Sequence, residues 1–296
     1  MTDAETATLE HEIRQQVRQF YDSIGWRQIG DGLYQNARYE DLRPVSREYI
    51  RRCHLRVMRY LPPSGKLLLD AGSGPIQYPE YLEYSRGYER RVCLDISRLA
   101  LVEARRRIGE HGLYVVGDVS RLPFAADVFS GVVSLHTVHH VPTERQGEAF
   151  EELHRVQHAG GRAVVVYSWG AHSLLMRVFR WPIRLTEKMI ARRVDRRAES
   201  EPPQSEEARA LLQASGTFAH HHDQKWLRRE LKRLPEHDIL VWRSVSTAFL
   251  RALVHRWAFG RTFLRLLYGV EEMAPHLMGR VGQYPMIVFG KDGGGN

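Results

Sequence analysis

Apolar positions in the first 64 residues repeat with the 3.6-residue period of amphipathic helices. In the first of two such stretches the apolar side chains are Leu9, Ile13, Val17 and Phe20. The pattern predicts helices over 5–20 and over 46–61, the second of which ends at Pro62-Pro63. Between the two helices we expect a loop over 21–39.

From residue 66 onward, short continuous apolar runs alternate with helical patterns. Such runs, bounded by turn residues, are typical of buried parallel strands. Strands that alternate with helices predict a parallel sheet covered on both faces. The predicted strands are 66–69, 91–95, 113–116, 128–135 and 162–168, the last after a Gly160-Gly161 turn, with helices over 99–108 and 143–155 and a further one that ends near Arg86.

Two later strands, 239–245 and 284–289, complete a mostly parallel, seven-stranded sheet of an α/β fold. Basic helical segments around 174–190 and 246–268 predict helical insertions after the fifth and sixth strands. A further helix, capped by Asp223, is expected up to Leu234, and the stretch around Glu201-Pro202-Pro203 breaks the pattern. In the segment that follows Ser246, one side carries Phe249, Leu250, Leu253, Val254 and Trp257.

Three successive predicted strands end in an acidic residue. The first runs into Asp70-Ala71-Gly72-Ser73-Gly74-Pro75, and the next two end at Asp95 and Asp118. Glycine removes the side chain that would keep a ligand from the backbone. A carboxylate at the end of the second strand can accept both hydroxyls of a ribose. Together these features predict a nucleoside-binding site at the carboxyl edge of the sheet.

The stretch 65–170 resembles the class I S-adenosylmethionine-dependent methyltransferases, in their small-molecule, type 11-like branch. The motifs that carry the resemblance are LLLDAGSGP, VCLDIS, VVGDVSRLPFAADVFSGVVSLHTVHHV and GGRAVVVY. The resemblance implies a Rossmann-like sandwich that binds S-adenosyl-L-methionine and methylates a small molecule. The positions it implies for the cofactor site are Asp70, Gly72 and Gly74 at the methionine part, Asp95 and Ile96 at the ribose, Asp118 and Val119 at the adenine, and Leu135 and His136 at the amino acid end.

Ile76 stands where this family usually has a third glycine, with Pro75 before it, so the loop after Gly74 departs from the family's pattern. The same loop argues against a nicotinamide-dependent oxidoreductase, which would need glycine at Gln77. That activity stays a distant alternative. A non-catalytic S-adenosylmethionine-binding regulatory protein is the other alternative.

Methyl transfer from a sulfonium is an in-line displacement that needs few catalytic side chains. For a hydroxyl acceptor a histidine near neutral pKa suits the work of a general base, and His140, or less favourably His139, is the candidate. Adjacent residues in an extended stretch point in opposite directions and cannot readily bind one metal ion together. We therefore interpret the run His220-His221-His222 as a loop that leads into the next helix, and no metal site is expected.

The predicted organisation has five parts. They are an N-terminal region with a cofactor lid (1–64), a cofactor-binding core (65–170), a helical insertion that caps the substrate (171–236), C-terminal strands and helices (237–292) and a tail (293–296). The aromatic residues Tyr21, Trp26, Tyr34 and Tyr39 crowd the lid region.

Composition and charge limit the kinds of binding partner that the sequence predicts. The net charge is +8 and nearly all of the 43 basic residues are Arg, but no nucleic-acid-binding motif accompanies them, so nucleic acid is not a favoured partner. The two inserted helical segments can pack on the core, dock on a membrane surface or join two copies, and packing is favoured. With two cysteines and an acidic, polar start, we expect a cytoplasmic protein. The large apolar residues of the two inserted segments predict a bulky, largely apolar acceptor, and the chain is expected to be a monomer or a homodimer.

Overall fold

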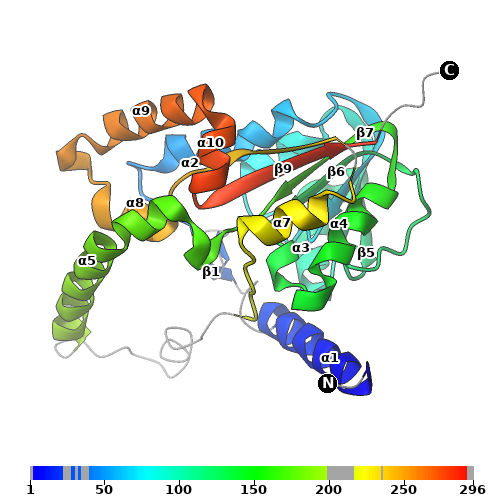
Figure 1. Cartoon of the computed structure of the whole chain (residues 1–296), viewed down its shortest axis with the longest axis horizontal. Coiled ribbons are helices and arrows are strands. Elements are labelled where there is room, and N and C mark those ends of the chain that lie inside the picture. The colour runs from blue at the N-terminus through cyan, green and yellow to red at the C-terminus, as the bar shows by residue number, and fades with distance from the viewer. Residues whose placement is uncertain are drawn as a thin grey trace.

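A computed structural model shows a mixed sheet with helices on both faces (Figure 1). The structure describes residues 3–22, 28–30, 33–34, 40–198, 217–234 and 236–291. Along the sheet the order is β5-β4-β3-β6-β7-β9-β8, and β9 runs antiparallel to both of its neighbours while the other pairs are parallel. The strands are β3 (Gly65–Ala71), β4 (Tyr88–Asp95), β5 (Gly112–Val116), β6 (Phe129–Leu135), β7 (Gln157–Val166), β8 (His237–Arg243) and β9 (Tyr284–Gly290).

The predicted seven-stranded, mostly parallel sheet is confirmed. The predicted position of the Gly160-Gly161 turn is wrong. Gly160 and Gly161 lie inside β7 and not before it, where Gly160 adopts φ +78° and the pairing with β6 becomes irregular. A glycine pair within a strand produces this kind of local irregularity.

Side chains of the central strands alternate between two apolar layers. Leu68 and Val133 face one layer, which contains α2 (Arg47–Arg56), α8 (Thr247–Leu253) and α9 (Gly260–Met273). Leu69 and Val132 face the other, which contains α4 (Gln146–Arg155) and α7 (Gln224–Leu231). The helix α3 (Arg98–Ile108) packs on β4 and β5. Burial on both faces explains why these strands are continuous apolar runs in the sequence.

Several elements differ from the predictions. A short hairpin of β1 (Gln28–Gly30) and β2 (Leu33–Tyr34) lies in the predicted loop, and a 3₁₀ helix, Pro79–Ser85, replaces the helix expected after the glycine turn. The segment 246–268 breaks between α8 and α9, so Trp257 is 83% exposed instead of sharing the buried side of Phe249.

Other helices lie outside the sheet's two layers or were not predicted. The helix α10 (Pro275–Val281), which the sequence did not indicate, packs on β8. The insertion after β7 is α5 (Leu174–Ala198), and α1 (Asp3–Phe20) forms as expected. None of the helices in the described ranges is long and apolar enough to cross a membrane. The predicted tail and the residues Glu201-Pro202-Pro203, Trp26 and Tyr39 lie outside the described residues.

The chain reverses its direction of travel along the sheet next to β3. From β3 it moves outward to β4 and β5, and then returns to place β6 on the other side of β3. At such a switch point the loops that follow the strands separate and leave a crevice at their carboxyl ends. The acids Asp70 and Asp95 and the end of β6 meet at this crevice.

Candidate functional site

A cavity of about 470 Å³ lies at the carboxyl edge of the sheet, over the switch point. This volume is within the range of small-molecule sites, about 300–1,000 Å³. All of the residues that the sequence predicted for the site line this cavity, namely Asp70, Gly72, Gly74, Asp95, Ile96, Asp118, Val119, Leu135, His136, His139 and His140. The three strand-end acids and the three histidines are therefore parts of one site.

The glycine turn after β3 needs left-handed backbone at Gly72 (φ +75°), Gly74 (φ +55°) and Ile76 (φ +56°). Its conformation is fixed by neighbours: a Cβ on Gly72 would lie 2.2 Å from the Thr137 hydroxyl oxygen. Ile76 keeps the backbone that glycine favours, at a cost of about 1–2 kcal/mol, because its side chain is buried with Cys93. The loss of the third glycine has thus not opened the turn.

Asp95 holds the turn from the neighbouring strand. Its Oδ2 accepts a hydrogen bond from the Gly74 amide at 2.9 Å and its Oδ1 accepts one from the Ser97 amide at 2.8 Å. Each carboxylate oxygen has two lone pairs, so each can accept one bond more. Burial raises the pKa of Asp95 to about 6, against the opposing effect of the two amides.

Asp70 is tied to a cation that the sequence analysis did not single out. The buried guanidinium of Arg91, on β4, donates to Asp70 Oδ2 through both Nε (3.1 Å) and its second terminal nitrogen. Since a buried carboxylate without a partner is very costly, Arg91 is what allows an acid at this end of β3. The pair also joins β3 to β4 beside the glycine turn.

Asp118 is held from two sides. Its Oδ1 accepts from the Ser120 amide at 2.8 Å and from the Ser120 hydroxyl at 2.7 Å. Its Oδ2 forms an ion pair with Arg14 Nε of α1, at 2.7 Å. Two residues beyond the C-terminal end of α1, Asp22 accepts a hydrogen bond of 2.5 Å from the Ser97 hydroxyl. These contacts place α1 across this end of the cavity.

His136 follows β6 with left-handed backbone (φ +55°). Its ring makes edge contacts with Trp242, at 4.8 Å between ring centroids, and with Tyr284, at 5.3 Å. Burial, and then the charge of Arg243, lower the pKa of His136 to about 3. The imidazole is therefore neutral at physiological pH and belongs to the aromatic lining.

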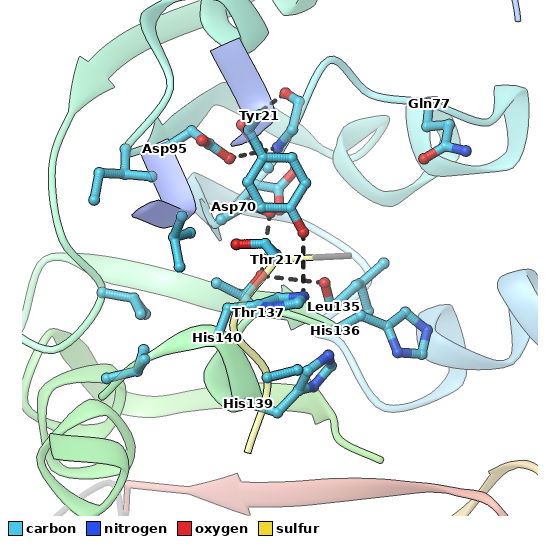
Figure 2. A pocket seen from close by; sticks show the side chains of 18 of the residues that line it. Tyr21, Asp70, Gln77, Asp95, Leu135, His136, Thr137, His139, His140 and Thr217 are labelled. Atoms are coloured by element: carbon cyan, nitrogen blue, oxygen red, sulfur yellow. Dashed lines mark hydrogen bonds between the residues drawn. The ribbon is translucent and has the colours of Figure 1, made fainter. Parts of the chain in front are cut away.

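His140 has both ring nitrogens engaged. The Phe218 carbonyl oxygen lies 2.6 Å from Nδ1 and the Tyr21 hydroxyl 3.1 Å from Nε2, and Figure 2 shows Tyr21 directing its hydroxyl to this ring. A carbonyl can only accept, so Nδ1 carries the proton and Nε2 is left as an acceptor. Burial lowers the pKa of His140, which keeps this neutral form at neutral pH.

His139 lies beside His140 but differs in its contacts. Its ring stacks on His221 at 4.8 Å, and within the described part of the chain its Nδ1 has no hydrogen-bond partner. Burial lowers the pKa of His139 well below the usual value. His221 also lines the cavity, a position that its place in a predicted loop did not reveal.

The end of the cavity farther along the sheet carries a buried ion pair that was not predicted. Arg243, at the end of β8, pairs with Glu40, and its guanidinium lies 4.7 Å from the centre of the Tyr284 ring. Burial alone would raise the pKa of Glu40, but the charges of Arg243 and His54 prevail and hold it below its usual range. Arg243 Nε is buried and has no hydrogen-bond partner among the described residues.

The histidine run before α7 does not form a metal centre in the structure. The His222 ring stacks on Trp226 at 3.7 Å, while the His221 ring stacks on His139. Across the described ranges, no group of three or more His, Cys, Asp or Glu side chains is arranged to hold a metal ion.

Comparison with known proteins places the core in a family. A model for the methyltransferase domain matches residues 69–165. The chain is 34% identical over 112 residues to the ubiquinone/menaquinone biosynthesis C-methyltransferase UbiE of Cereibacter sphaeroides. The aligned region covers 36% of this chain and 43% of that protein. It is 32% identical over 111 residues to the tRNA (carboxymethyluridine(34)-5-O)-methyltransferase alkbh8 of Xenopus tropicalis, covering 36% of this chain and 16% of that one. The chain thus spans less than half the length of these relatives.

Solved structures share the fold over nearly the whole chain. Phosphoethanolamine N-methyltransferase 1 of Haemonchus contortus, in complex with phosphoethanolamine and S-adenosylhomocysteine, matches with a TM-score of 0.58 at 10% identity, over 97% of this chain and 51% of that one. The [4+2]-cyclase SpnF matches with a TM-score of 0.50 at 16% identity, over 95% and 97%. At such identities the likeness shows the fold alone. The family model thus matches the core alone, residues 69–165, as a methyltransferase domain of the type 11 branch, and the solved structures show that the chain has the fold of the class I S-adenosylmethionine-dependent methyltransferases.

Proposed function

We propose that this chain transfers a methyl group from S-adenosylmethionine to a small, largely apolar metabolite. The observation that carries the proposal is a single cavity with two different ends. One end has the glycine turn and the carboxylate of Asp95, and the other has aromatic rings around Arg243. A donor and an acceptor bound at the two ends would meet near the end of β6.

The lining fits the donor. Each oxygen of Asp95 keeps a lone pair beyond its backbone bond, so the two can receive the two ribose hydroxyls, with Ile96 alongside. Gly72 and Gly74 have no side chains to keep a ligand from their backbone. S-adenosylmethionine, when bound, supplies a methyl group that its sulfonium has made electrophilic. The other proposed contacts are Asp118 and Val119 at the adenine and Leu135 and His136 at the amino acid end, with Asp70 fixing the turn.

The acceptor end supports an aromatic or otherwise apolar molecule that carries one hydrogen-bond-accepting oxygen. Tyr78, Tyr284 and the neutral ring of His136 provide flat apolar surface there. The buried Nε of Arg243 is a donor without a partner among the described residues. An unsatisfied buried donor costs about 1–3 kcal/mol, and an acceptor oxygen would satisfy it.

S-adenosylmethionine held by Asp95 and the glycine turn would supply the methyl group to a lone pair of the acceptor, and the electron pair of the broken carbon–sulfur bond would stay with the departing S-adenosylhomocysteine. For a hydroxyl acceptor, the proton passes to the Tyr21 oxygen while Tyr21 gives its own proton to Nε2 of His140. The neutral state of His140 and its 3.1 Å contact with Tyr21 support this route. His139, stacked on His221, supports the position of the loop.

Calorimetric titration of S-adenosylmethionine and S-adenosylhomocysteine into the full chain tests the donor site. Asp95→Ala should abolish binding, while Asp238→Ala, an exposed acid whose nearest ionic partner is His276 at 3.9 Å, should bind as the wild type does. No binding by the wild type would refute the proposal.

Turnover is tested separately, with methyl-labelled donor and a panel of apolar hydroxyl- and carbon-acid acceptors. Incorporation of label that is lost in His140→Ala and Tyr21→Phe would support the proton route. Tight donor binding with no labelled product from the whole panel would instead favour a non-catalytic S-adenosylmethionine-binding regulator.

A further inference from the structure

One face of α5 is apolar and exposed along the part whose side chains are described. Its apolar residues lie three or four positions apart, which places them in one row on the helix surface. They are between 46% and 75% exposed. The row consists of Leu174, Val178, Trp181, Leu185 and Met189. Among the described residues, the core packs against the opposite face, where Met176 and Ile183 are buried.

A row of basic residues runs along one flank of this apolar row. All four members are exposed, and within the described part of the chain none of them forms an ion pair. They are Arg177, Arg180, Arg184 and Lys188. Successive members are again three or four positions apart, so the positive charge lies along a single side of the helix.

A second exposed apolar row lies on the neighbouring helix. Its members on α9 and at the residue before it are between 44% and 85% exposed, and they are Phe259, Phe263, Leu266, Val270 and Met273. α8 connects the two helices, since Phe179 of α5 and Phe263 of α9 both contact Phe249. Figure 1 shows α5, α8 and α9 together at one end of the molecule, far from β5.

We propose that α5 docks this chain on an anionic lipid surface. Its apolar row would enter the interface between headgroups and acyl chains, and its basic row would face the phosphates. Helices with an apolar face and Lys or Arg at its border bind such interfaces in the membrane plane, and tryptophan favours the headgroup level. The charge of +8 on the whole chain acts in the same direction.

The basic row argues for lipid over a second copy of the chain. Two α5 helices packed through their apolar rows would bring positive charge to the borders of the contact, where paired helices place charges of opposite sign. An anionic bilayer supplies the opposite charge on every side. α5 also follows the carboxyl end of β7, the edge of the sheet where the cavity lies.

Flotation of the full chain with vesicles tests the proposal without any measure of methyl transfer. We expect binding to phosphatidylcholine vesicles that contain phosphatidylglycerol, weak binding to pure phosphatidylcholine, and loss of binding in Val178→Ser/Trp181→Ser. Arg177→Gln/Arg180→Gln/Arg184→Gln should weaken binding about 100-fold at low salt, from about 1 kcal/mol per charge and 1.4 kcal/mol per tenfold.

The matched control is Leu113→Ser/Val116→Ser, which removes two exposed apolar side chains of β5, 46% and 55% exposed, from the opposite end of the molecule. It should bind vesicles as the wild type does. Absence of binding by the wild type overturns the proposal. In that case, analytical ultracentrifugation shows what the apolar row of α5 contacts instead. A dimer that dissociates in Val178→Ser/Trp181→Ser means that the row joins two copies of the chain, and a monomer means that the chain's own residues cover the row. Binding that survives both α5 variants also overturns it.

Discussion

Asp95 combines a buried carboxylate with a raised pKa, and this makes ligand binding depend on pH. The proposed ribose contact needs the ionised form, because only that form accepts on both oxygens. With a pKa of about 6, protonation competes as the pH falls through 6. The affinity for S-adenosylhomocysteine should then drop about tenfold between pH 7.5 and pH 5, in proportion to the ionised fraction. Calorimetry across this range measures it.

Asp95→Asn separates this effect from other titrations in the site. The amide cannot ionise, so the variant should bind weakly at every pH and show a flat profile between pH 5 and pH 7.5. A profile in the variant that still falls with acid would assign the pH dependence to another group.

Gly72 and Gly109 both have left-handed backbone, with φ of +75° and +62°, but differ in surroundings. A Cβ at Gly72 meets Thr137 at 2.2 Å, whereas at Gly109 no atom lies within 4 Å. Gly109→Ala should therefore cost only the backbone strain, about 1–2 kcal/mol. Gly72→Ala should cost about 2–5 kcal/mol, since overpacking adds about 1–3 kcal/mol. Urea denaturation compares the two, and equal losses would contradict the packing argument.

The residues found from the sequence are those that follow strands in order along the chain. Asp95, Asp118 and the glycine turn could be predicted because each ends a strand of a parallel sheet. Arg14 and Glu40 could not, because their partners are more than a hundred residues away and no local pattern links them. Arg243 left one signal, a charged residue that interrupts the apolar run of its strand.

At the scale of elements, α1 is fastened across the cavity by polar contacts at its surface. The ion pair of Arg14 with Asp118 is partly buried and worth about 1 kcal/mol. Arg14→Gln should therefore raise hydrogen exchange in α1, and the dissociation rate of bound S-adenosylhomocysteine, about fivefold. Arg18→Gln is the control, since Arg18 pairs with Asp22 at 3.6 Å in a more exposed position. Equal effects of the two substitutions would remove the role assigned to Arg14.

The elements that the sequence predicted wrongly are short and depend on tertiary contacts. After the glycine turn, Tyr78, Tyr81 and Tyr84 repeat every three residues, and their rings contact one another at 5.3 and 5.4 Å. Side chains three apart are aligned in a 3₁₀ helix, so this repeat was a signal for the structure observed. α10 has only seven residues and is set by its contact with β8, where a Cβ on Gly279 would collide with the Leu240 backbone.

At the scale of the whole molecule, alternation of strands and helices was enough to predict the sheet. It also placed the two insertions after the fifth and sixth strands. It did not distinguish the two helices of the region 171–236: α7 packs its Leu227 and Leu231 in the layer that covers the sheet, while α5 exposes an apolar row. The apolar residues of α5 and of α7 both repeat with helical periodicity, and periodicity alone does not predict which of the two faces the fold will bury.

The antiparallel β9 brings β8 beside it so that Arg243 ends at the same edge as the glycine turn. Arg243 and Tyr284, which would contact the acceptor, thus come from a late segment of the chain, whereas Asp95 and the glycine turn, which would hold the donor, come from an early one. Exchange of the late segment between related proteins can therefore alter which molecule is modified while the donor site keeps its sequence. For protein engineering, this order along the chain separates a donor-binding segment that can stay constant from a late segment around Arg243 that can be exchanged.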